Sequence, residues 1–212
     1  MALFRIETNS AYRLGVWKIE ESEAQLVELS GIQAPTALHN PSRRLEHLAV
    51  RATAKKMGLN PSSIAYMNNG KPYTTVSDTH ISISHTKGYA ALLISNIPLI
   101  GVDIEHHSLR VLKIRKKFMH PIEEQHLLSL QLSENEELES VLLHWCAKEA
   151  LFKAIPDDGI DFANELQLNA FVKPQSEGCF EGLALRSGQR FQVNYLIDPE
   201  FVLTCCFSRE SK

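Results

Sequence analysis

Apolar and polar positions recur with strand or helix spacing along the chain and predict two successive sets of elements. In the first half, period-two patterns predict strands at residues 12–19, 81–85 and 89–95, and helical spacing predicts helices at 20–30 and 42–57. The second helix has clear start signals, because Asn40 can cap it and Pro41 fits its first turn. Residues 64–73 predict a hairpin, since Asn69-Gly70 favours a type I′ turn.

The second half repeats this outline. Its pattern predicts a strand at residues 99–105, a helix opened by Pro121, an acidic connection at 133–137 and a long helix at 138–155. Short strands at 166–172, 179–185, 191–197 and 201–207 then predict a meander. Because each half has a helix followed by strands, we expect two similar halves, residues 1–97 and 98–212.

Composition narrows the classes of protein. A hydrophobic share of 44% is ordinary for a globular chain of 212 residues, and no apolar run is long enough to span a bilayer. The first residues lack a signal-peptide pattern and the four cysteines form no C-x-x-C pair, so we expect a protein of the reducing cytoplasm. The net charge of −3 gives no global signal for nucleic acid.

Two carboxylates interrupt the apolar strand at 99–105. Side chains alternate across a strand, so Asp103 and Glu105 point to one face while Val102 and Ile104 point to the other. Two adjacent acids repel each other and raise each other's pKa. The strand is therefore either a solvated edge of a sheet or part of a site that binds a cation.

A third carboxylate lies in the apolar stripe of the long helix. The stripe follows helical spacing and comprises Leu138, Leu142, Trp145, Glu149 and Phe152. Burying an unpaired carboxylate is costly, and Lys153, one turn after Glu149, offers a partner. Glu149 is therefore either half of an ordinary ion pair at a groove edge or a metal ligand.

Basic residues gather between Arg110 and Lys117, where five positive charges occur without an acid; we call residues 110–117 the basic segment. It is either a solvated face or a docking site for an acidic macromolecule. Arg43 and Arg44, at the start of the helix at 42–57, are likewise either solvated or part of an anion site.

Four motifs in register resemble the 4′-phosphopantetheinyl transferases, and in particular their larger, single-chain, pseudo-dimeric surfactin type. These are GVDIE at 101–105, WCAKEA at 145–150, NGKP at 69–72 and ISH at 83–85. The resemblance covers about residues 40–155 and implies an α+β fold of two similar halves related by a pseudo-twofold axis. It also implies transfer of the phosphopantetheine arm from coenzyme A to a serine of an acyl or peptidyl carrier protein.

The resemblance implies a role for each matching residue. Asp103, Glu105 and Glu149 would hold Mg²⁺ against the pyrophosphate of coenzyme A. Phosphate contacts would come from Lys71, Ser84, His85 and Lys153. The base for the carrier serine would be Glu149 or Glu123. Three carboxylates and a pyrophosphate supply the oxygen ligands that Mg²⁺ prefers.

The partners follow from the same resemblance. The basic segment would dock the acidic carrier protein, and two halves in one chain predict a monomer. The basic residues that grip the 3′-phosphate in some relatives have no clear match here, so Arg43 or Arg44 would replace them.

Two other functions remain open. The first is a metal-dependent phosphohydrolase in which Asp103 and Glu105 act with His85, His106 and His107. The second is a non-catalytic module whose basic segment binds an acidic protein or nucleic acid, with Glu149 dispensable.

Overall fold

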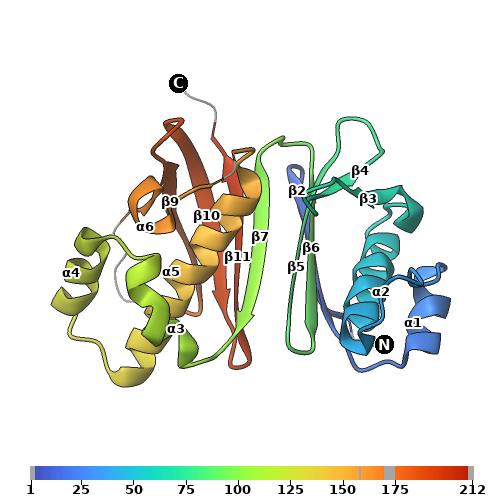
Figure 1. Cartoon of the computed structure of the whole chain (residues 1–212), viewed down its shortest axis with the longest axis horizontal. Helices are drawn as coiled ribbons and strands as arrows, with labels where there is room; N and C mark the ends of the chain where they lie inside the picture. Colours follow the sequence, from blue (N-terminus) through green and yellow to red (C-terminus); the bar gives the residue numbers. More distant parts are fainter. Residues whose placement is uncertain (1–2, 158, 170–174, 210–212) are drawn as a thin grey trace. The chain divides into compact units, whose positions relative to one another are not determined.

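A computed structural model describes residues 3–157, 159–169 and 175–209 of the chain. The chain divides into two compact units, Met1–Pro98 and Leu99–Lys212, which are described separately below. Helices and antiparallel sheets make up both units (Figure 1), which confirms the expected α+β fold. Within the described ranges, no helix is long and apolar enough to cross a membrane.

The first unit is built on a four-stranded antiparallel sheet in the order β1-β2-β6-β5. The strands are β1 (Leu3–Thr8), β2 (Tyr12–Lys18), β5 (His80–Thr86) and β6 (Tyr89–Ser95). The sequence patterns predicted three of them and missed β1. Residues 4–7 do alternate between apolar and polar, but the apolar Phe4 and Ile6 are the exposed side chains of β1.

Two helices follow β2, and their ends match the capping signals. The helices are α1 (Glu23–Ser30) and α2 (Pro41–Lys56), and α2 packs against β2 and β6. The side chain of Asn40 accepts a hydrogen bond from Arg43 N, as expected for a helix cap.

The expected hairpin is present, but its turn is of a different type. The strands β3 (Ile64–Tyr66) and β4 (Pro72–Thr74) follow the short helix η1 (Pro61–Ser63). Tyr66 pairs with Pro72, which leaves five residues in the loop, and Gly70 has a positive φ whereas Asn69 does not. A type I′ turn needs a positive φ at both central residues, so the predicted turn type was wrong.

The second unit is built on a five-stranded antiparallel sheet in the order β7-β11-β10-β9-β8. The strands are β7 (Ile100–His106), β8 (Leu166–Leu168), β9 (Glu177–Ala184), β10 (Gln189–Ile197) and β11 (Phe201–Ser208). The meander of the last four strands is confirmed. Residues 170–172 of the first expected strand lie outside the described residues.

Helices of the second unit lie on one side of this sheet (Figure 1). They are α3 (Arg110–Ile114), η2 (Arg115–Lys117), α4 (Pro121–Ser129), α5 (Glu134–Ala154) and α6 (Phe162–Glu165). The longest, α5, packs against β7 and β11. Cys205 and Cys206 of β11 are both buried.

Helix α5 begins earlier than expected. Residues 133–137, expected as an acidic connection, form its cap and first turn, because Ser133 and Glu136 make a capping box. Three glutamates then lie where the helix dipole favours negative charge. The signal for this start was present in the sequence and was read as a loop.

The expected apolar stripe of α5 is not its core face. Leu143, Cys146, Ala147 and Ala150 are fully buried. Of the expected stripe only Leu142 is buried, whereas Leu138, Trp145 and Phe152 are partly buried. The helix is covered on most of its surface, and these three residues mark its partly open side. Glu149 therefore lies at the edge of the core, where a carboxylate is less costly than at its centre.

Gly101 allows α5 to lie directly on β7. A Cβ atom at Gly101 would stand 1.8 Å from the carbonyl oxygen of Ala150 and 2.8 Å from its carbonyl carbon. Both of these are backbone atoms and cannot swing aside. Glycine is therefore the residue that fits this contact between helix and strand.

Gly101→Ala is expected to destabilise the protein by about 3 kcal/mol in chemical unfolding, because the methyl group must push the α5 backbone off β7. Gly178→Ala is the matched control on the same sheet. Its methyl group would meet the end of the Tyr195 side chain, which can rotate away. Equal losses for the two variants would contradict the close contact at Gly101.

Candidate functional site in the second unit and a pocket in the first

Strand β7 presents two acids toward α5. Asp103 is buried and Glu105 is half-buried, while Val102 and Ile104 are fully buried on the other face. The register with β11 is regular along this stretch, Thr204 pairing with Asp103 and Val202 with Glu105. β7 is the edge strand of its sheet, in the order β7-β11-β10-β9-β8, but its two acids are buried and half-buried and not solvated.

Helix α5 brings a lysine and a third acid to the same place. Lys153 Nζ lies 2.6 Å from Asp103 Oδ1 and 3.1 Å from the carbonyl oxygen of Val102. Glu149, one turn earlier on the helix, is half-buried. We call Asp103, Glu105 and Glu149 the acid cluster.

The acid cluster is electrostatically strained. Burial, together with the negative charges of Asp103 and Glu105, raises the pKa of Glu149 to about 7, against the pull of Lys153. Burial and Asp103 also raise the pKa of Glu105, whereas a hydrogen bond from Trp145 lowers it. A bound cation would stabilise the ionised forms of these carboxylates, because a single lysine now compensates up to three negative charges.

The donor set of the acid cluster suits Mg²⁺ in its chemistry, since the ion prefers carboxylate, phosphate and water oxygens. Over the ranges that the structure describes, however, no group of three or more His, Cys, Asp or Glu side chains is arranged to hold a metal ion. The three acids are close enough to shift one another's pKa but do not form a ready-made cage.

The second unit is also the part of the chain that a family model matches. The model describes the 4′-phosphopantetheinyl transferase superfamily and matches residues 99–206, slightly more than half of the chain. The chain belongs to this superfamily. A search among curated proteins finds no match. The expected family is thus confirmed, while the larger pseudo-dimeric class stays a prediction.

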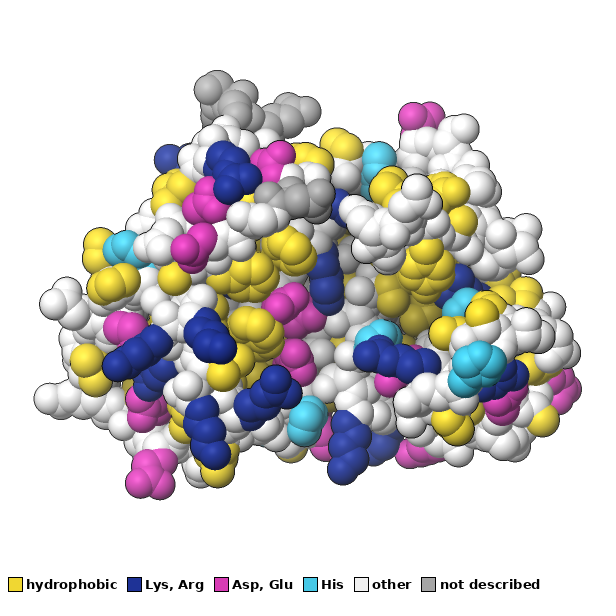
Figure 2. Space-filling view, viewed as in Figure 1, with side chains coloured by type: hydrophobic (Ala, Val, Ile, Leu, Met, Phe, Trp, Pro, Cys, Tyr) yellow, Lys and Arg dark blue, Asp and Glu magenta, His cyan; other side chains and the backbone are white. Residues whose placement is uncertain are grey.

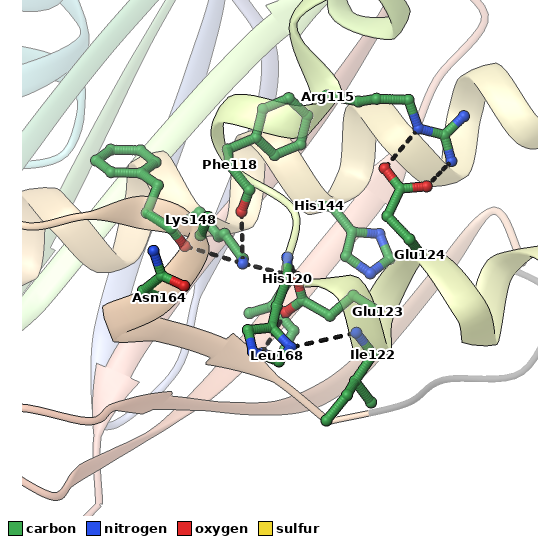
Figure 3. A network of polar contacts seen from close by, with 12 residues as sticks. Arg115, Phe118, His120, Ile122, Glu123, Glu124, His144, Lys148, Asn164 and Leu168 are labelled. Atoms are coloured by element: carbon green, nitrogen blue, oxygen red, sulfur yellow. Dashed lines mark hydrogen bonds and ion pairs between the residues drawn. The ribbon is translucent and has the colours of Figure 1, made fainter.

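Glu123, expected as one of two possible bases of the transferase, is occupied by structural contacts (Figure 3). Oε2 accepts hydrogen bonds from Lys148 Nζ at 2.7 Å and His120 N at 2.8 Å, and Oε1 accepts one from Leu168 N at 3.0 Å. The side chain is only 5% exposed. A carboxylate that is buried and saturated in this way is unsuited to take a proton from a substrate.

The basic segment contributes fewer free charges than its sequence predicts. Arg115 binds Glu124 through two hydrogen bonds of 2.8 and 2.6 Å and Glu137 through one of 2.6 Å. It thus ties η2 to α4 and α5. The exposed cations of the segment are Arg110, Lys113, Lys116 and Lys117. Figure 2 shows Lys and Arg side chains gathered over the α3 part of this unit.

A pocket of about 700 Å³ connects this segment to the acid cluster. Its walls include Lys116 and Lys117 on one side, Glu149 on another, and the rings of Trp145 and Phe162. All of these residues belong to the second unit. The transferase thus has an apolar pocket with cations at one wall and an acid of raised pKa at another.

The first unit has a pocket of its own, of about 650 Å³, which contains two of its expected site residues. Arg43 and His85 line it, and a guanidinium nitrogen of Arg43 lies 2.6 Å from Nε2 of His85. Glu46 lies beside both, 3.0 Å from Arg43. The loop residues Gly70 and Pro72, on either side of Lys71, also line it.

Two other expected residues lie elsewhere in this unit. Arg44 forms an ion pair with Glu23 and donates to the carbonyl oxygens of Pro35 and Leu38, so it ties α2 to α1 and the loop between them. Ser84 is on the opposite face of β5 from His85 and does not line the pocket. Of the two candidate arginines, Arg43 is therefore the better placed for an anion.

Sequence reasoning missed the deepest cation of this pocket. Arg51 is only 3% exposed and donates hydrogen bonds to the Tyr66 hydroxyl at 3.0 Å and the Ile64 carbonyl oxygen at 3.4 Å. Both acceptors are neutral. Burial and the charge of Arg51 lower the pKa of the neighbouring His47 to about 4. Arg51 lies within the predicted helix at 42–57, and its place in the sequence gives no sign that it faces inward.

The histidines do not support the alternative phosphohydrolase. His106 alternates with Glu105 along β7 and so points to the opposite face from the acid cluster. His107 Nε2 lies 2.8 Å from the carbonyl oxygen of Asp198. Within the second unit, His106 and His107 thus do not complete a metal site around Asp103 and Glu105.

Glu149→Gln is expected to change how stability depends on pH. The folded pKa of Glu149 is about 7, above its ordinary value of 4.5, so the folded state holds the proton more tightly and wild-type stability falls as pH rises from 4.5 through 7. Removing this charge should stabilise the metal-free protein by roughly 2 kcal/mol at pH 8 and by almost nothing at pH 4, after allowing for solvent screening.

Thermal unfolding of both proteins without divalent metal between pH 4 and pH 8 measures this difference. Glu134→Gln, an exposed acid at the start of the same helix, serves as the control and should show no such pH dependence. If the wild type and Glu149→Gln differ equally at both pH values, Glu149 does not carry the raised pKa.

Proposed function

We propose that this chain transfers the 4′-phosphopantetheine arm of coenzyme A to a serine hydroxyl of an acyl or peptidyl carrier protein, in a Mg²⁺-dependent reaction. The serine oxygen forms a bond to the β-phosphorus, the pyrophosphate bond breaks, and adenosine 3′,5′-bisphosphate leaves. The observation that carries the proposal is the meeting of Asp103, Glu105, Glu149 and Lys153 inside the part of the chain that matches the superfamily.

The acid cluster and Lys153 would handle the charge of the reaction. Asp103, Glu105 and Glu149 would hold Mg²⁺, which would neutralise the pyrophosphate as negative charge develops on the leaving group. Lys153 now neutralises Asp103, and its side chain is 28% exposed, so it remains within reach of a phosphate. Electrostatic stabilisation of this kind is the main contribution that a protein makes to phosphoryl transfer.

Glu149 is the stronger candidate for the base. Glu123 is buried and saturated by three hydrogen bonds, whereas Glu149 is half-buried and lines the pocket. In the proposed reaction Glu149 takes the proton of the carrier serine. The pocket beside it gives a substrate access to this carboxylate.

The pocket of the first unit is proposed to bind the nucleotide end of coenzyme A. Arg43, His85 and the buried Arg51 supply cationic or hydrogen-bonding groups for phosphate, and Tyr66 and Pro72 supply an apolar surface for a base. Lys71 follows the loop that forms one wall. His47, neutral at pH 7, adds a polar group without charge.

Transfer is measured by the mass of an apo carrier protein after incubation with coenzyme A and Mg²⁺. The carrier should gain one phosphopantetheine, and Glu149→Gln should lower kcat at least about a hundredfold while the protein stays folded. Glu134→Gln should keep wild-type activity. If no carrier gains mass, the transferase proposal fails, and if Glu149→Gln is fully active, Glu149 has neither of its proposed roles.

The pocket that joins Glu149 to Lys116 and Lys117 also supports docking of the carrier on the basic segment. A carrier held by these lysines would present its serine close to Glu149. Arg115, which is bound to Glu124 and Glu137, would take no part. The chain is expected to act as a monomer in this complex, because two similar halves in one chain predict a monomer.

Reversing the charge of Lys116 and Lys117 to glutamate is expected to raise KM for an acidic carrier roughly tenfold, because electrostatic attraction between the partners is lost. KM for coenzyme A should stay within twofold, and the wild-type KM for the carrier should rise with salt. Lys87→Glu, an exposed lysine in the first unit, serves as control. An unchanged carrier KM in the double variant would exclude these two lysines from docking.

A further inference from the structure

The lysine that precedes Glu149 has a completely buried ammonium group. The side chain of Lys148 is 0% exposed, and Nζ donates to Phe118 O at 2.7 Å, Glu123 Oε2 at 2.7 Å and Phe162 O at 3.0 Å (Figure 3). An ammonium group has three donors, so Lys148 is fully satisfied. It is shielded from solvent and has no donor left for a substrate.

Two of the three acceptors of Lys148 are backbone carbonyl groups of phenylalanines that pack against the same tryptophan. The rings of Phe118 and Phe162, whose carbonyl groups Lys148 holds, both contact the indole of Trp145. Phe118 meets it edge to face with ring centres 5.1 Å apart, and Phe162 lies 5.8 Å away in a tilted arrangement. Because the backbone of each phenylalanine is fixed by one ammonium group, the space between their rings is fixed as well.

The indole held in this space reaches the acid cluster. Trp145 Nε1 donates a hydrogen bond of 3.2 Å to Glu105 Oε1. Glu105 is half-buried beside Asp103, which repels it, so a donor is needed to keep its carboxylate in one orientation. The contacts therefore run without a break from Lys148 through two phenylalanines and Trp145 to Glu105.

We propose that Lys148 is a positioning residue, which fixes Glu105 through the Phe118–Trp145–Phe162 aromatic group and does not bind substrate. This inference rests on the proposed function, in which Glu105 is one of the residues that hold Mg²⁺. Outer contacts of this kind fix the orientation of a metal ligand, and losing them lowers metal affinity by about 10- to 100-fold.

The first test removes the link nearest to Glu105. Trp145→Phe keeps an aromatic ring but deletes the N–H group, so the Mg²⁺ concentration that gives half-maximal transfer should rise about tenfold. KM for the carrier should stay within twofold. Leu143→Ala, a fully buried residue on the face of α5 opposite Trp145, is the control for a general loss of packing and should leave the Mg²⁺ requirement unchanged.

The second test removes the link farthest from Glu105. Lys148→Met combined with Glu123→Gln avoids a lone buried carboxylate and leaves both phenylalanine carbonyls without the ammonium group. This variant should show the same rise in Mg²⁺ requirement. Adding Trp145→Phe to it should give no further rise, because all three substitutions act through one hydrogen bond.

A fluorescence signal tests the same link without substrate or metal. The chain has two tryptophans, Trp17 and Trp145, so Trp17→Phe leaves Trp145 as the single reporter. In that background, the Lys148→Met/Glu123→Gln variant should shift the Trp145 emission to longer wavelength. Leu143→Ala should leave the emission unchanged, even where it lowers the melting temperature to a similar extent.

The outcomes separate the two proposals. If the wild type transfers phosphopantetheine but neither variant changes its Mg²⁺ requirement, the positioning role is wrong and the transferase stands. If the wild type transfers nothing, the transferase proposal fails. In that case the fluorescence emission alone tests the link between Lys148 and Trp145. An unchanged Trp145 spectrum overturns this link, and a shift to longer wavelength supports it.

Discussion

The direct contact between α5 and β7 is the constraint on which the rest of the second unit depends. A single missing Cβ at Gly101 lets the carbonyl oxygen of Ala150 lie against the strand. This contact brings Lys153 within 2.6 Å of Asp103 and places Glu149 where both strand acids raise its pKa. The chemistry of the site is thus a consequence of packing distance, because charges on two elements interact strongly only when their backbones are this close.

Lys148 and Glu149, neighbours on α5, differ in how well their charges are compensated. Lys148 and Glu123 form a buried pair in which every donor of the ammonium group is used, and their role is to hold α4, α6 and β8 around the helix. Glu149, one position later, faces two acids and shares one lysine with them. A saturated pair stabilises the fold, whereas an undercompensated acid keeps a tendency to bind a cation or a proton.

What the sequence could predict follows from how local each signal is. The cap at Asn40, the strand at 99–105 and the closing meander depend on near neighbours, and the structure has all three. The start of α5 was readable from Ser133 and Glu136 but was missed. By contrast, the structural roles of Glu123 and Arg115 depend on partners from other elements, such as Leu168 N and Glu137. No spacing along the chain reports such partners.

The two units help to explain why the acids lie in only one of them. The two units share a strand order. In the first unit the last strand, β6, lies between β5 and β2, and in the second unit the last strand, β11, lies between β10 and β7. β2 and β7 are the strands that precede the long helix of each unit. β2 and β7 each have a glycine that faces the long helix of their unit. Gly15 of β2 lies against Thr53, and Gly101 of β7 lies against Ala150. Two residues later, however, β2 has the fully buried Trp17 where β7 has Asp103. A glycine thus lets a helix lie close to a strand in both units, against side chains at Gly15 and against the helix backbone at Gly101. The side chain two residues after the glycine then decides whether this closeness serves an apolar core or a charged site.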